Sequence, residues 1–347
     1  MKTTTLNSCD TTCTDMNPTF RRDVIRGLSA EQKFLEAKYF YDERGDKLFQ
    51  QIMQCPEYYL TDAEMDIMLH QSDRILDECL KMHAHFDIVE LGAGDASKTI
   101  HLLKRALERG IADHYYPIDI SPNTIGYLED NLPQQLPGMT IEGLAGEYFQ
   151  MLEKLNSRQA KPKLVLFLGA TIGNMAPEEA KYFCKELQTY MNDGDILLIG
   201  FDLKKDPATI LAAYNDAAGI TAAFNYNLLD RINRELGGNF NTEMFAHYPV
   251  YDPGTGSCKS YLISKEHQAV TLDDGTTFRF DKDEAIFMEV SQKYSLKDIN
   301  MLAKASGFTP LTSFFDSRSL FVDALWKVPG LKQFLSNTPG KISDVRY

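Results

Sequence analysis

The sequence has few of the features that mark membrane, secreted or nucleic-acid-binding proteins. No segment approaches the roughly 18–20 consecutive apolar residues that span a bilayer, and residues 1–16 are polar and lack the apolar centre of a signal peptide. Acidic side chains outnumber basic ones by 49 to 36, and the formal net charge is -13, so a broad basic surface for nucleic acid is not expected. We expect a cytoplasmic monomer with no membrane or nucleic-acid partner, and a disordered arm over residues 1–16.

The six cysteines give no sign of a disulfide framework or of a metal site. Cys9 and Cys13 form a C-x3-C pair in the polar arm, with no matching Cys/His pair further along the chain. The other four, which are isolated in the sequence, are Cys55, Cys79, Cys184 and Cys258. Isolated cysteines are typical of a reducing compartment, and the seven histidines show no metal-ligand spacing. We therefore expect free thiols and no metal.

Apolar segments alternate with helix-like segments through the middle of the chain. The 347 residues leave room for one large domain or two ordinary ones. Strands are predicted near 86–91, 115–120, 140–144, 163–168 and 195–201, with amphipathic helices between them. Continuously apolar strands are typical of a parallel sheet that helices cover on both faces. The fold class predicted is α/β, with a Rossmann-like sheet.

The pattern differs on either side of this region. Residues 29–67 have helical periodicity that is interrupted at Asp42-Glu-Arg-Gly45, and after Pro207 short β-like segments are separated by turns such as Asp252-Pro-Gly-Thr-Gly256. These parts would form an α+β domain interleaved with the α/β domain. We predict a substrate-binding domain over residues 17–60 and 205–286, and the α/β domain over residues 61–204 and 287–347.

A glycine-rich turn follows the first predicted strand, in Phe86-Asp-Ile-Val-Glu-Leu-Gly-Ala-Gly-Asp95. Strand, glycine turn and helix let a backbone approach a nucleotide-like ligand closely. The second strand ends in Asp119, 25 residues after Gly94, and a carboxylate there can bind both ribose hydroxyls of an adenosine. A dinucleotide site would have a third glycine where Ser97 stands. Glu90-Leu-Gly-Ala-Gly94 instead resembles motif I of S-adenosylmethionine-dependent methyltransferases, although NAD(P) binding or an ordinary glycine turn also fits this segment by itself.

A second loop with glycines, Gly169-Ala-Thr-Ile-Gly-Asn-Met175, follows the predicted strand Leu164–Leu168. Ligands of doubly wound sheets lie beyond the carboxyl ends of the strands, so Asn174 is expected near the reacting centre. Its amide can donate to a carboxylate and accept from an amine. On local grounds Asn174 could also cap the helix that is predicted from Pro177.

Several motifs, taken together, resemble the histidine-specific Nα-methyltransferase family of ergothioneine biosynthesis. The likeness covers roughly residues 20–330, and the motifs come in the family's order. They are Lys38-Tyr-Phe-Tyr-Asp-Glu-Arg-Gly45, Pro56-Glu-Tyr-Tyr59, Glu90-Leu-Gly-Ala-Gly94, Phe167-Leu-Gly-Ala-Thr-Ile-Gly-Asn174, Gly200-Phe-Asp-Leu-Lys-Lys-Asp206, Ala213-Tyr-Asn-Asp216, Phe224-Asn-Tyr-Asn-Leu228, Ile232-Asn-Arg-Glu-Leu-Gly237 and Met288-Glu-Val-Ser-Gln-Lys-Tyr294.

The resemblance implies trimethylation of the α-amino group of L-histidine to hercynine, with three molecules of S-adenosylmethionine. It implies that Gly92 and Lys98 serve the methionine part of this cofactor and that Asp119 binds its ribose. Glu147 and Tyr148, where the family usually has Asp-Phe, would lie by the adenine. The full set of implied cofactor-binding residues is Glu90, Gly92, Gly94, Lys98, Asp119, Glu147 and Tyr148.

The resemblance also implies a substrate site. Tyr58 and Asn174 would bind the amino-acid end of the substrate, with Tyr214 on its carboxylate and Tyr41 near the amine, which makes Tyr41 and Asn174 the implied catalytic pair. Tyrosine rings suit a quaternary ammonium through cation–π attraction, worth about 0.5–2 kcal/mol each. For the neighbouring tyrosines, Tyr39 and Tyr59, packing remains an alternative.

The imidazole would be bound by Glu289 and Ser291. Strand alternation puts both side chains on one face, and a carboxylate with a hydroxyl can hold both ring nitrogens. Against an indole the carboxylate would be left unpaired, a costly arrangement; a surface charge is the alternative for Glu289. Ser260 stands where the family commonly has a methionine beside the imidazole. This departure leaves tryptophan or a derivative as a second substrate hypothesis, and a catalytically silent ligand-binding protein is the third hypothesis.

Overall fold

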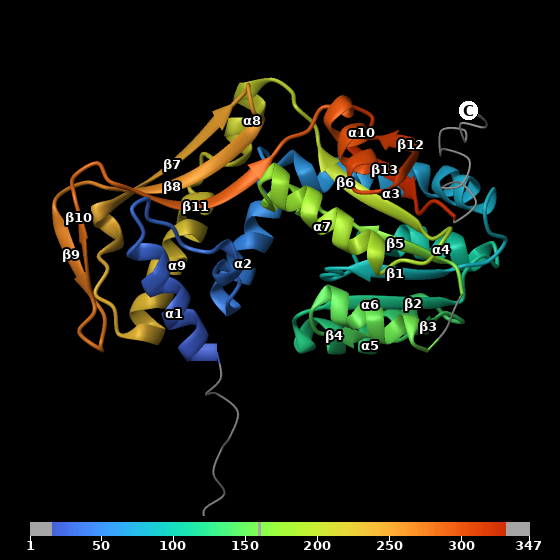
Figure 1. Cartoon of the computed structure of the whole chain (residues 1–347), viewed down its shortest axis with the longest axis horizontal. Helices are drawn as coiled ribbons and strands as arrows, with labels where there is room; N and C mark the ends of the chain where they lie inside the picture. The colour runs from blue at the N-terminus through green and yellow to red at the C-terminus, as the bar shows by residue number, and fades with distance from the viewer. Residues whose placement is uncertain (1–15, 159–160, 331–347) are drawn as a thin grey trace, which may run out of the picture. The chain divides into compact units, whose positions relative to one another are not determined.

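The computed structural model describes residues 16–158 and 161–330, which form two compact units (Figure 1). Among the described residues, the first unit comprises 16–58, 208–251 and 258–289, and the second comprises the remainder. The predicted arm, with Cys9 and Cys13, lies outside the described residues except for Met16, which begins a helix.

The second unit is built around an eight-stranded sheet in the order β12-β13-β6-β5-β1-β2-β3, with β4 also paired to β2. The strands are β1 Asp87–Leu91, β2 His114–Asp119, β3 Thr140–Ile141, β4 Leu144–Ala145, β5 Lys163–Phe167, β6 Ile196–Asp202, β12 Thr309–Phe315 and β13 Phe321–Lys327. The pairings among β1, β2, β5 and β6 are parallel, which confirms the predicted Rossmann-like α/β fold. Strand β13 runs antiparallel to β6 and β12, because the short turn from β12 allows only that direction.

Helices cover this sheet and explain why its strands are apolar without alternation. They are α3 Tyr59–Leu80, α4 Thr99–Glu108, α5 Pro122–Gln135, α6 Tyr148–Asn156, α7 Pro177–Thr189 and α10 Leu296–Ala305 (Figure 1). Side chains of α6, α7 and α10 share one hydrophobic core with alternate residues of β1, β2, β5 and β6. The strands β1, β5 and β6 are buried at every position, as sheets covered on both faces require.

The third predicted strand, over 140–144, is two separate two-residue strands. Strand β3 pairs with His114 and Tyr115, and β4 pairs with Ile118 and Asp119. Gly143 lies between them, where an added Cβ would come within 2.3 Å of a side-chain carbon of Ile125 on α5. The close approach of α5 therefore interrupts what the sequence suggested was one strand.

The order of the strands fixes where a ligand can bind. Strand β2 follows β1 on one side, whereas β5 lies on the other side of β1. This reversal of strand order is the topological switch point at which α/β sheets bind ligands, beyond the carboxyl ends of the strands. The loops after Leu91 and Phe167, which contain the two predicted glycine segments, both leave from this edge.

The first unit combines helices with two small sheets. Its helices are α1 Met16–Leu28, η1 Ala37–Phe40, α2 Glu43–Met53, α8 Pro207–Ala213, α9 Ile220–Leu236 and η3 Thr242–Met244, and its strands are β7 Phe245–Asp252, β8 Ser257–Ser264, β9 Gln268–Thr271, β10 Thr277–Phe280 and β11 Ala285–Gln292. Strands β11, β8 and β7 form one sheet, and β10 and β9 form the other. One hydrophobic core joins them, with side chains such as Phe20, Leu228, Leu262 and Met288.

The structure corrects the predicted interruption at Asp42-Glu-Arg-Gly45. Gly45 lies inside the first turn of α2, where an added Cβ would lie 1.8 Å from the carbonyl oxygen of Phe40. Asp42 is the N-cap, and its carboxylate accepts a 2.7 Å hydrogen bond from the Gly45 N–H. This segment therefore begins a helix, and the glycine is needed for a close approach. Helix α1 was not anticipated from the sequence.

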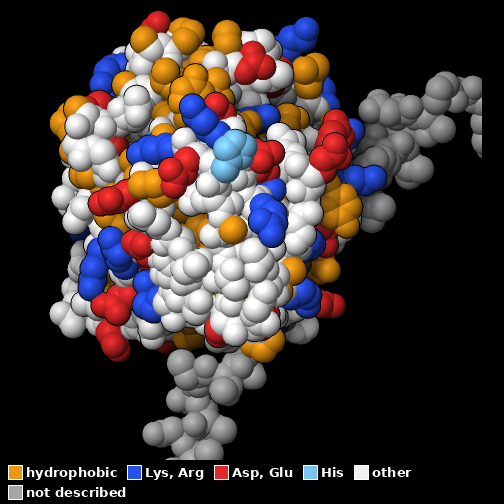
Figure 2. Space-filling model, turned by 90° about the vertical axis from the view of Figure 1, so that its left-hand side faces the viewer, with side chains coloured by type: hydrophobic (Ala, Val, Ile, Leu, Met, Phe, Trp, Pro, Cys, Tyr) orange, Lys and Arg blue, Asp and Glu red, His pale blue; other side chains and the backbone are white. Residues whose placement is uncertain are grey.

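Cysteine burial and surface charge fit the composition. The four described cysteines are free and buried, and burial raises the pKa of Cys79 and Cys184 to about 12, which makes their thiols unreactive. Figure 2 shows positive and negative side chains interspersed over one face. In the first unit, Arg21 pairs with Asp273 at 2.7 Å. None of the described helices has both the length and the apolarity to cross a membrane.

Candidate active site

The turn after β1 is shaped for a close backbone approach. Gly92 and Gly94 have φ values of +75° and +54°, in the left-handed region that favours glycine. An added Cβ at Gly92 would lie 2.8 Å from the hydroxyl oxygen of Tyr148, at the start of α6, whereas one at Gly94 would meet no atom within 4 Å. Gly92 therefore lies against the predicted adenine-side tyrosine, and Gly94 borders open space. Glu147, the N-cap of α6, is exposed beside Tyr148.

Asp119 lies at the rim of this turn. Its Oδ2 accepts a hydrogen bond from the backbone N–H of Gly94 at 3.4 Å, and its Oδ1 accepts one from the N–H of Ser121 at 2.9 Å. The side chain is half-buried. Two backbone donors therefore fix the carboxylate beside the glycine turn, which is the position predicted for a ribose-binding residue.

Glu90 lies deeper than a direct cofactor contact would need. Its side chain is 3% exposed, and it accepts hydrogen bonds from the hydroxyls of Thr99 on α4, at 2.6 Å, and of Tyr115 on β2. Burial raises the pKa of Glu90 to about 7, although both hydroxyls act in the opposite direction. Glu90 thus ties β1, β2 and α4 together beneath the glycine turn instead of lying at its rim.

Lys98 is held by a residue that the sequence analysis missed. The Lys98 ammonium pairs with the carboxylate of Glu64, on α3, which is fully buried. The same carboxylate accepts hydrogen bonds from the backbone N–H of Gly169, at 2.8 and 3.0 Å, at the start of the loop after β5. Burial alone would lower the pKa of Lys98, but Glu64 raises it above its ordinary value. An acidic residue on the apolar side of α3, next to Ala63 and Ile67, was the signal that could have revealed Glu64.

A second buried carboxyl, Asp323 on β13, adjoins this pair. An added Cβ at Gly200 would lie 2.4 Å from Oε1 of Glu64 and 3.2 Å from Oδ1 of Asp323, so both groups lie against the same glycine. Neither oxygen of Asp323 has a hydrogen-bond partner among the described residues. Burial, and then the charge of Glu64, raise the pKa of Asp323 well above its ordinary value. The raised pKa favours the neutral, protonated form of Asp323, next to the ion pair of Glu64 and Lys98, whose two charges balance.

Asn174 ends a short 3-10 helix, η2 Thr171–Asn174, in the loop after β5. Its side chain is exposed, and the N-cap of α7 is Ala176, so the alternative that Asn174 caps this helix is wrong. The preceding residue, Gly173, lies against the segment that follows Val290. An added Cβ at Gly173 would lie 3.0 Å from the carbonyl oxygen of Gln292 and 3.8 Å from Oγ of Ser291. The second unit thus brings the Asn174 loop and Ser291 side by side.

Tyrosines 41, 58 and 214 belong to one aromatic cluster in the first unit. The rings of Tyr58 and Tyr214 have centroids 6.3 Å apart at 76°, and Phe49 lies 5.7 Å from Tyr41 and 6.4 Å from Tyr58. The ring centroid of Phe224, on α9, lies 5.8 Å from that of Tyr41 and 6.0 Å from that of Phe49. Tyr41 is 48% exposed, so its ring is open to a ligand. The sequence had indicated the tyrosines but not Phe49, which joins them from α2.

The neighbouring tyrosines have structural roles. The Tyr39 hydroxyl donates a 2.7 Å hydrogen bond to Oδ2 of Asp23, in the core of the first unit. The Tyr59 hydroxyl donates to the carboxylate of Asp202, at 2.9 and 3.1 Å, in the second unit. Packing, the alternative left open for both, is what the structure shows.

The structure does not place Ser260 on the face of β8 where the imidazole group was expected. Side chains alternate along β8, so Ser260 shares the buried face of Leu262. Glu289 shares the other face of this sheet with Phe287, whose ring lies 5.8 Å from that of Tyr261. The prediction that Ser260 lies beside the group held by Glu289 is therefore corrected, and Tyr261 is on the same face as Glu289 instead.

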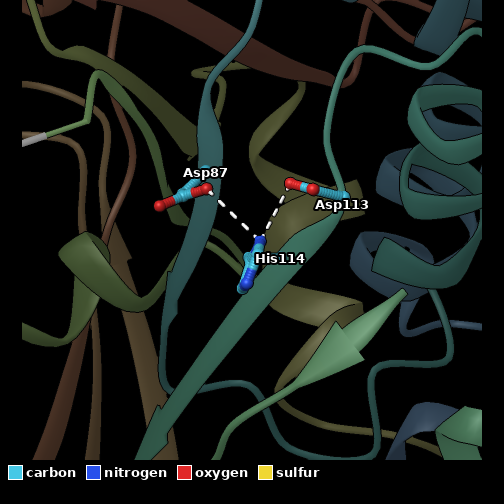
Figure 3. Close-up of side chains that lie close together, drawn as sticks. All are labelled: Asp87, Asp113 and His114. Atoms are coloured by element: carbon cyan, nitrogen blue, oxygen red, sulfur yellow. Dashed lines mark hydrogen bonds and ion pairs between the residues drawn. The ribbon is translucent and has the colours of Figure 1, made fainter. Parts of the chain in front are cut away.

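One further cluster lies at the opposite ends of the strands. Figure 3 shows Asp87, Asp113 and His114, at the starts of β1 and β2, close together. The His114 Nδ1 lies 2.8 Å from Asp113 Oδ1 and 3.9 Å from Asp87 Oδ1, and Lys161 lies 3.5 Å from the same Asp87 oxygen. The basic groups that face both carboxylates account for the cluster as ion pairing, and we assign no metal to it.

Comparison with known proteins identifies the family. A family model described as a histidine-specific, S-adenosylmethionine-dependent methyltransferase matches residues 20–328. The chain belongs to this family. Histidine N-alpha-methyltransferase of Mycobacterium tuberculosis is 34% identical over 288 residues, which cover 83% of this chain and 88% of the relative. The protein is therefore an S-adenosylmethionine-dependent N-methyltransferase.

Other relatives of this methyltransferase have other names. Ergothioneine biosynthesis protein 1 of Schizosaccharomyces pombe is 28% identical over 286 residues, which cover 81% of this chain and 37% of that protein. L-tryptophan methyltransferase trpM of Psilocybe serbica is 27% identical over 331 residues, which cover 88% of this chain and 91% of the relative. Because relatives carry the names of two amino acids, membership of the family does not by itself fix the substrate.

The residues at the switch point of the methyltransferase fit its cofactor. A Cβ at Gly92 would meet the Tyr148 hydroxyl, so only glycine leaves the backbone of this turn open to the close approach of a ligand. Asp119 offers a fixed carboxylate for ribose hydroxyls, and the Lys98 ammonium, whose charge Glu64 maintains, suits a ligand carboxylate. S-adenosylmethionine held by these residues would supply an electrophilic methyl group.

Proposed function

We propose that this methyltransferase acts on the α-amino group of L-histidine and forms hercynine through three successive methyl transfers, as a step of ergothioneine biosynthesis. The observation that carries the proposal is the spacing of Glu289 and Ser291, two positions apart in strand β11, since strand alternation favours one face for both side chains. The similarity to histidine N-alpha-methyltransferase of Mycobacterium tuberculosis supports it. The domain roles predicted from the sequence, with substrate binding in the first unit, are part of the same proposal.

Asn174 is proposed to orient the amine. The nucleophile is a nitrogen lone pair, so a bound ammonium must first lose a proton to solvent water; the C–N bond then forms as the bond between the sulfonium and the methyl carbon breaks. An exposed amide at the carboxyl end of β5 can accept a hydrogen bond from the amine and direct its lone pair toward the neighbouring cofactor edge. Alignment of this kind can lower a barrier by several kcal/mol, on the order of 7–11 at best. The protein needs no covalent intermediate for this reaction.

The aromatic cluster is proposed to accommodate the product as it gains methyl groups. Each transfer makes the α-nitrogen more apolar, and the trimethylated nitrogen keeps its positive charge at every pH. Tyr41, Tyr58 and Tyr214 offer ring faces that attract such a cation without hydrogen bonds. Side chains that accept hydrogen bonds from the ammonium N–H groups would instead lose one hydrogen bond with each methyl group added.

Glu289 and Ser291 are proposed to recognise the imidazole. Their side chains are half-buried and buried, respectively, so water competes poorly for them. An imidazole satisfies a carboxylate with its N–H and a hydroxyl with its other nitrogen, whereas an indole has one N–H and no acceptor nitrogen. Leaving a desolvated polar group without a partner costs about 1–3 kcal/mol, so the pair favours histidine.

Tryptophan is the second candidate. The 27% identity to L-tryptophan methyltransferase trpM of Psilocybe serbica supports this alternative. The departure at Ser260 no longer supports it, since this side chain lies on the face opposite to that of Glu289. Glu289 itself remains an argument for histidine.

The deciding experiment is a mass-spectrometric assay of the purified protein with S-adenosylmethionine and each of the twenty amino acids, followed over time. We expect histidine alone to gain one, two and then three methyl groups. Methylation of tryptophan with histidine untouched would overturn the proposal and keep the family. The variant Glu289→Gln should lower kcat/KM for histidine by at least about tenfold, whereas Glu266→Gln, at an exposed carboxylate between β8 and β9, should not.

A further inference from the structure

Lys293 is a buried lysine with an unusual partner. Its side chain is 0% exposed, although a lysine ammonium is rarely buried unless it is paired. The Nζ lies 2.6 Å from Oδ2 of Asp202, at the end of β6, and donates a 2.8 Å hydrogen bond to Oγ of Ser291. A buried charge therefore touches the hydroxyl that is proposed to recognise the substrate side chain.

The chemistry of the two groups fixes the direction of this hydrogen bond. An ammonium has three donors and no acceptor, so Ser291 can only accept from Lys293. The single hydrogen of the hydroxyl must then point to some other acceptor. A hydroxyl that accepts from a cation also becomes a stronger donor, because hydrogen bonds in a chain polarise one another. Lys293 thus prepares Ser291 to donate.

A second lysine shares the carboxylate of Asp202. Lys205 also pairs with the Asp202 carboxylate and donates a 2.7 Å hydrogen bond to the hydroxyl of Tyr59. Two lysines therefore share one carboxylate. Burial lowers the pKa of Lys205, while Asp202 raises it and Lys293 lowers it further. Asp316 also raises the pKa of Lys205, and of the two lysines Lys293 is the one that donates to Ser291.

The backbone holds this arrangement in place. The N–H of Tyr294 donates to the carbonyl of Asp202 at 3.0 Å, and the N–H of Lys293 donates to the carbonyl of Gly256 at 2.8 Å. The Gln292 amide accepts from Ser257 Oγ at 2.7 Å. Because the Gly173 backbone lies against the same segment, the hydroxyl of Ser291 has a fixed place beside the loop of Asn174.

We propose that Lys293 is a positioning residue that sets substrate specificity, by orienting the Ser291 hydroxyl as a donor to a ring nitrogen that carries a lone pair. The site would then take a neutral five-membered ring with one acceptor nitrogen, and Glu289 would accept from the other ring N–H. This inference rests on the proposed function, since it requires that Ser291 binds the substrate side chain. The inference adds that the site selects the neutral form of the substrate's ring, with its lone pair facing Ser291, and that the buried Lys293 makes this selection.

The first test compares the kinetics of Lys293→Met and Lys205→Met in the whole protein. Both variants remove one ammonium from the Asp202 carboxylate, but only Lys293 contacts Ser291 in the structure described. We expect Lys293→Met to raise KM for histidine about tenfold, and to leave KM for S-adenosylmethionine within about twofold of wild type. Lys205→Met should leave both values near wild type. Equal changes in the two variants would overturn the proposal.

The second test is the coupling of Lys293 to Ser291. In a protein that already carries Ser291→Ala, the further change Lys293→Met should alter KM for histidine by less than about twofold, because its target hydroxyl is gone. If Lys293 acted only on folding, Lys293→Met would change KM for histidine by the same factor with or without Ser291→Ala. Such a result would also overturn the proposal.

If Lys293→Met does not fold, a double variant can replace it in both tests. Lys293→Met leaves Asp202 with fewer partners, whereas Asp202→Asn with Lys293→Met removes both charges of the pair and avoids an uncompensated buried carboxylate. The same rise in KM for histidine is expected in this double variant, again abolished by Ser291→Ala. An unchanged KM would refute the role of Lys293.

The wild-type assay separates this inference from the function on which it rests. If the wild type does not methylate histidine, both fail. If it does, and Ser291→Ala raises KM for histidine while Lys293→Met does not, only the role of Lys293 fails.

Discussion

The carboxylate of Glu64 accepts the backbone N–H of Gly169 at 2.8 Å, and so joins helix α3 to the loop that begins after β5. The same carboxylate pairs with Lys98, in the segment between the glycine turn and α4. One buried side chain therefore ties together the two loops of the switch point, where we expect the methyltransferase to bind its cofactor. Its importance follows from the number of separate segments that it connects.

Replacing Glu64 by Gln should destabilise the protein and weaken cofactor binding. The change leaves the Lys98 ammonium, whose side chain is 22% exposed, without its carboxylate. We expect the free energy of unfolding to fall by about 2–3 kcal/mol, somewhat less than for a fully buried pair. Urea denaturation and calorimetric titration with S-adenosylmethionine would measure both effects. The control is Glu78→Gln on the same helix, whose pair with Lys81 is more exposed and worth under about 1 kcal/mol; similar losses in both variants would contradict the assignment.

Gly92→Ala should impair cofactor binding far more than Gly110→Ala. Both glycines have positive φ, +75° and +64°, so each alanine carries a similar backbone strain, on the order of 1 kcal/mol. Only at Gly92 does the new Cβ meet an atom, the Tyr148 hydroxyl at 2.8 Å. We expect at least about a tenfold rise in the Kd for S-adenosylmethionine for Gly92→Ala, and a Kd near wild type for Gly110→Ala. Calorimetry would reveal the difference, and equal Kd values would show that the contact does not matter.

Phe49→Leu should change how the enzyme handles its partly methylated intermediates. The ring of Phe49 contacts Tyr41 and Tyr58, so its loss would leave both tyrosines less firmly held. Aromatic pairs contribute about 1 kcal/mol each, so a roughly fivefold fall in kcat/KM is expected, with accumulation of the dimethylated product. Time courses of the three products by mass spectrometry would test this. Phe278→Leu, in the same hydrophobic core but outside the aromatic cluster, should lower stability and leave the product pattern unchanged.

His247→Gln should make the protein less sensitive to acid. Burial lowers the pKa of His247 from its ordinary value of 6.5 to about 4, while Asp216 acts in the opposite direction. The unfolded chain therefore binds a proton more readily than the folded one, and the folded state loses stability as the pH falls from about 6.5 through 4. The free energy of unfolding, measured by urea denaturation at several pH values across this range, should fall less steeply with falling pH for His247→Gln than for wild type. A matched change at the exposed His267, paired with Asp281, should follow the wild-type curve.

Much of the second unit could be predicted from local patterns. Apolar runs separated by amphipathic segments gave strands β1, β2, β5 and β6 to within a few residues, because burial on both faces leaves a continuous apolar signature. The glycine turn and Asp119 were also recognisable, since a positive φ and a carboxylate after the second strand are local requirements. The antiparallel direction of strand β13 depended on the turn from β12.

The site was less predictable wherever two distant segments meet. The position of Ser260 depended on which face of β8 turns inward, and strand register decides that. Phe49 gave no local sign that it would join Tyr41 to Tyr58, because an aromatic residue on an amphipathic helix is ordinarily core.

The sequence by itself determined the central strands, the glycine turn with Asp119 and the identity of the chemical groups, because spacing along one strand or turn encodes them. Only the tertiary structure decided how the buried charges are paired. Glu64 with Lys98, and Asp202 with Lys293, are separated by 34 and 91 positions, respectively, yet each pair lies in direct contact. A buried charge must find its partner in space, and periodicity along the chain does not record where that partner lies.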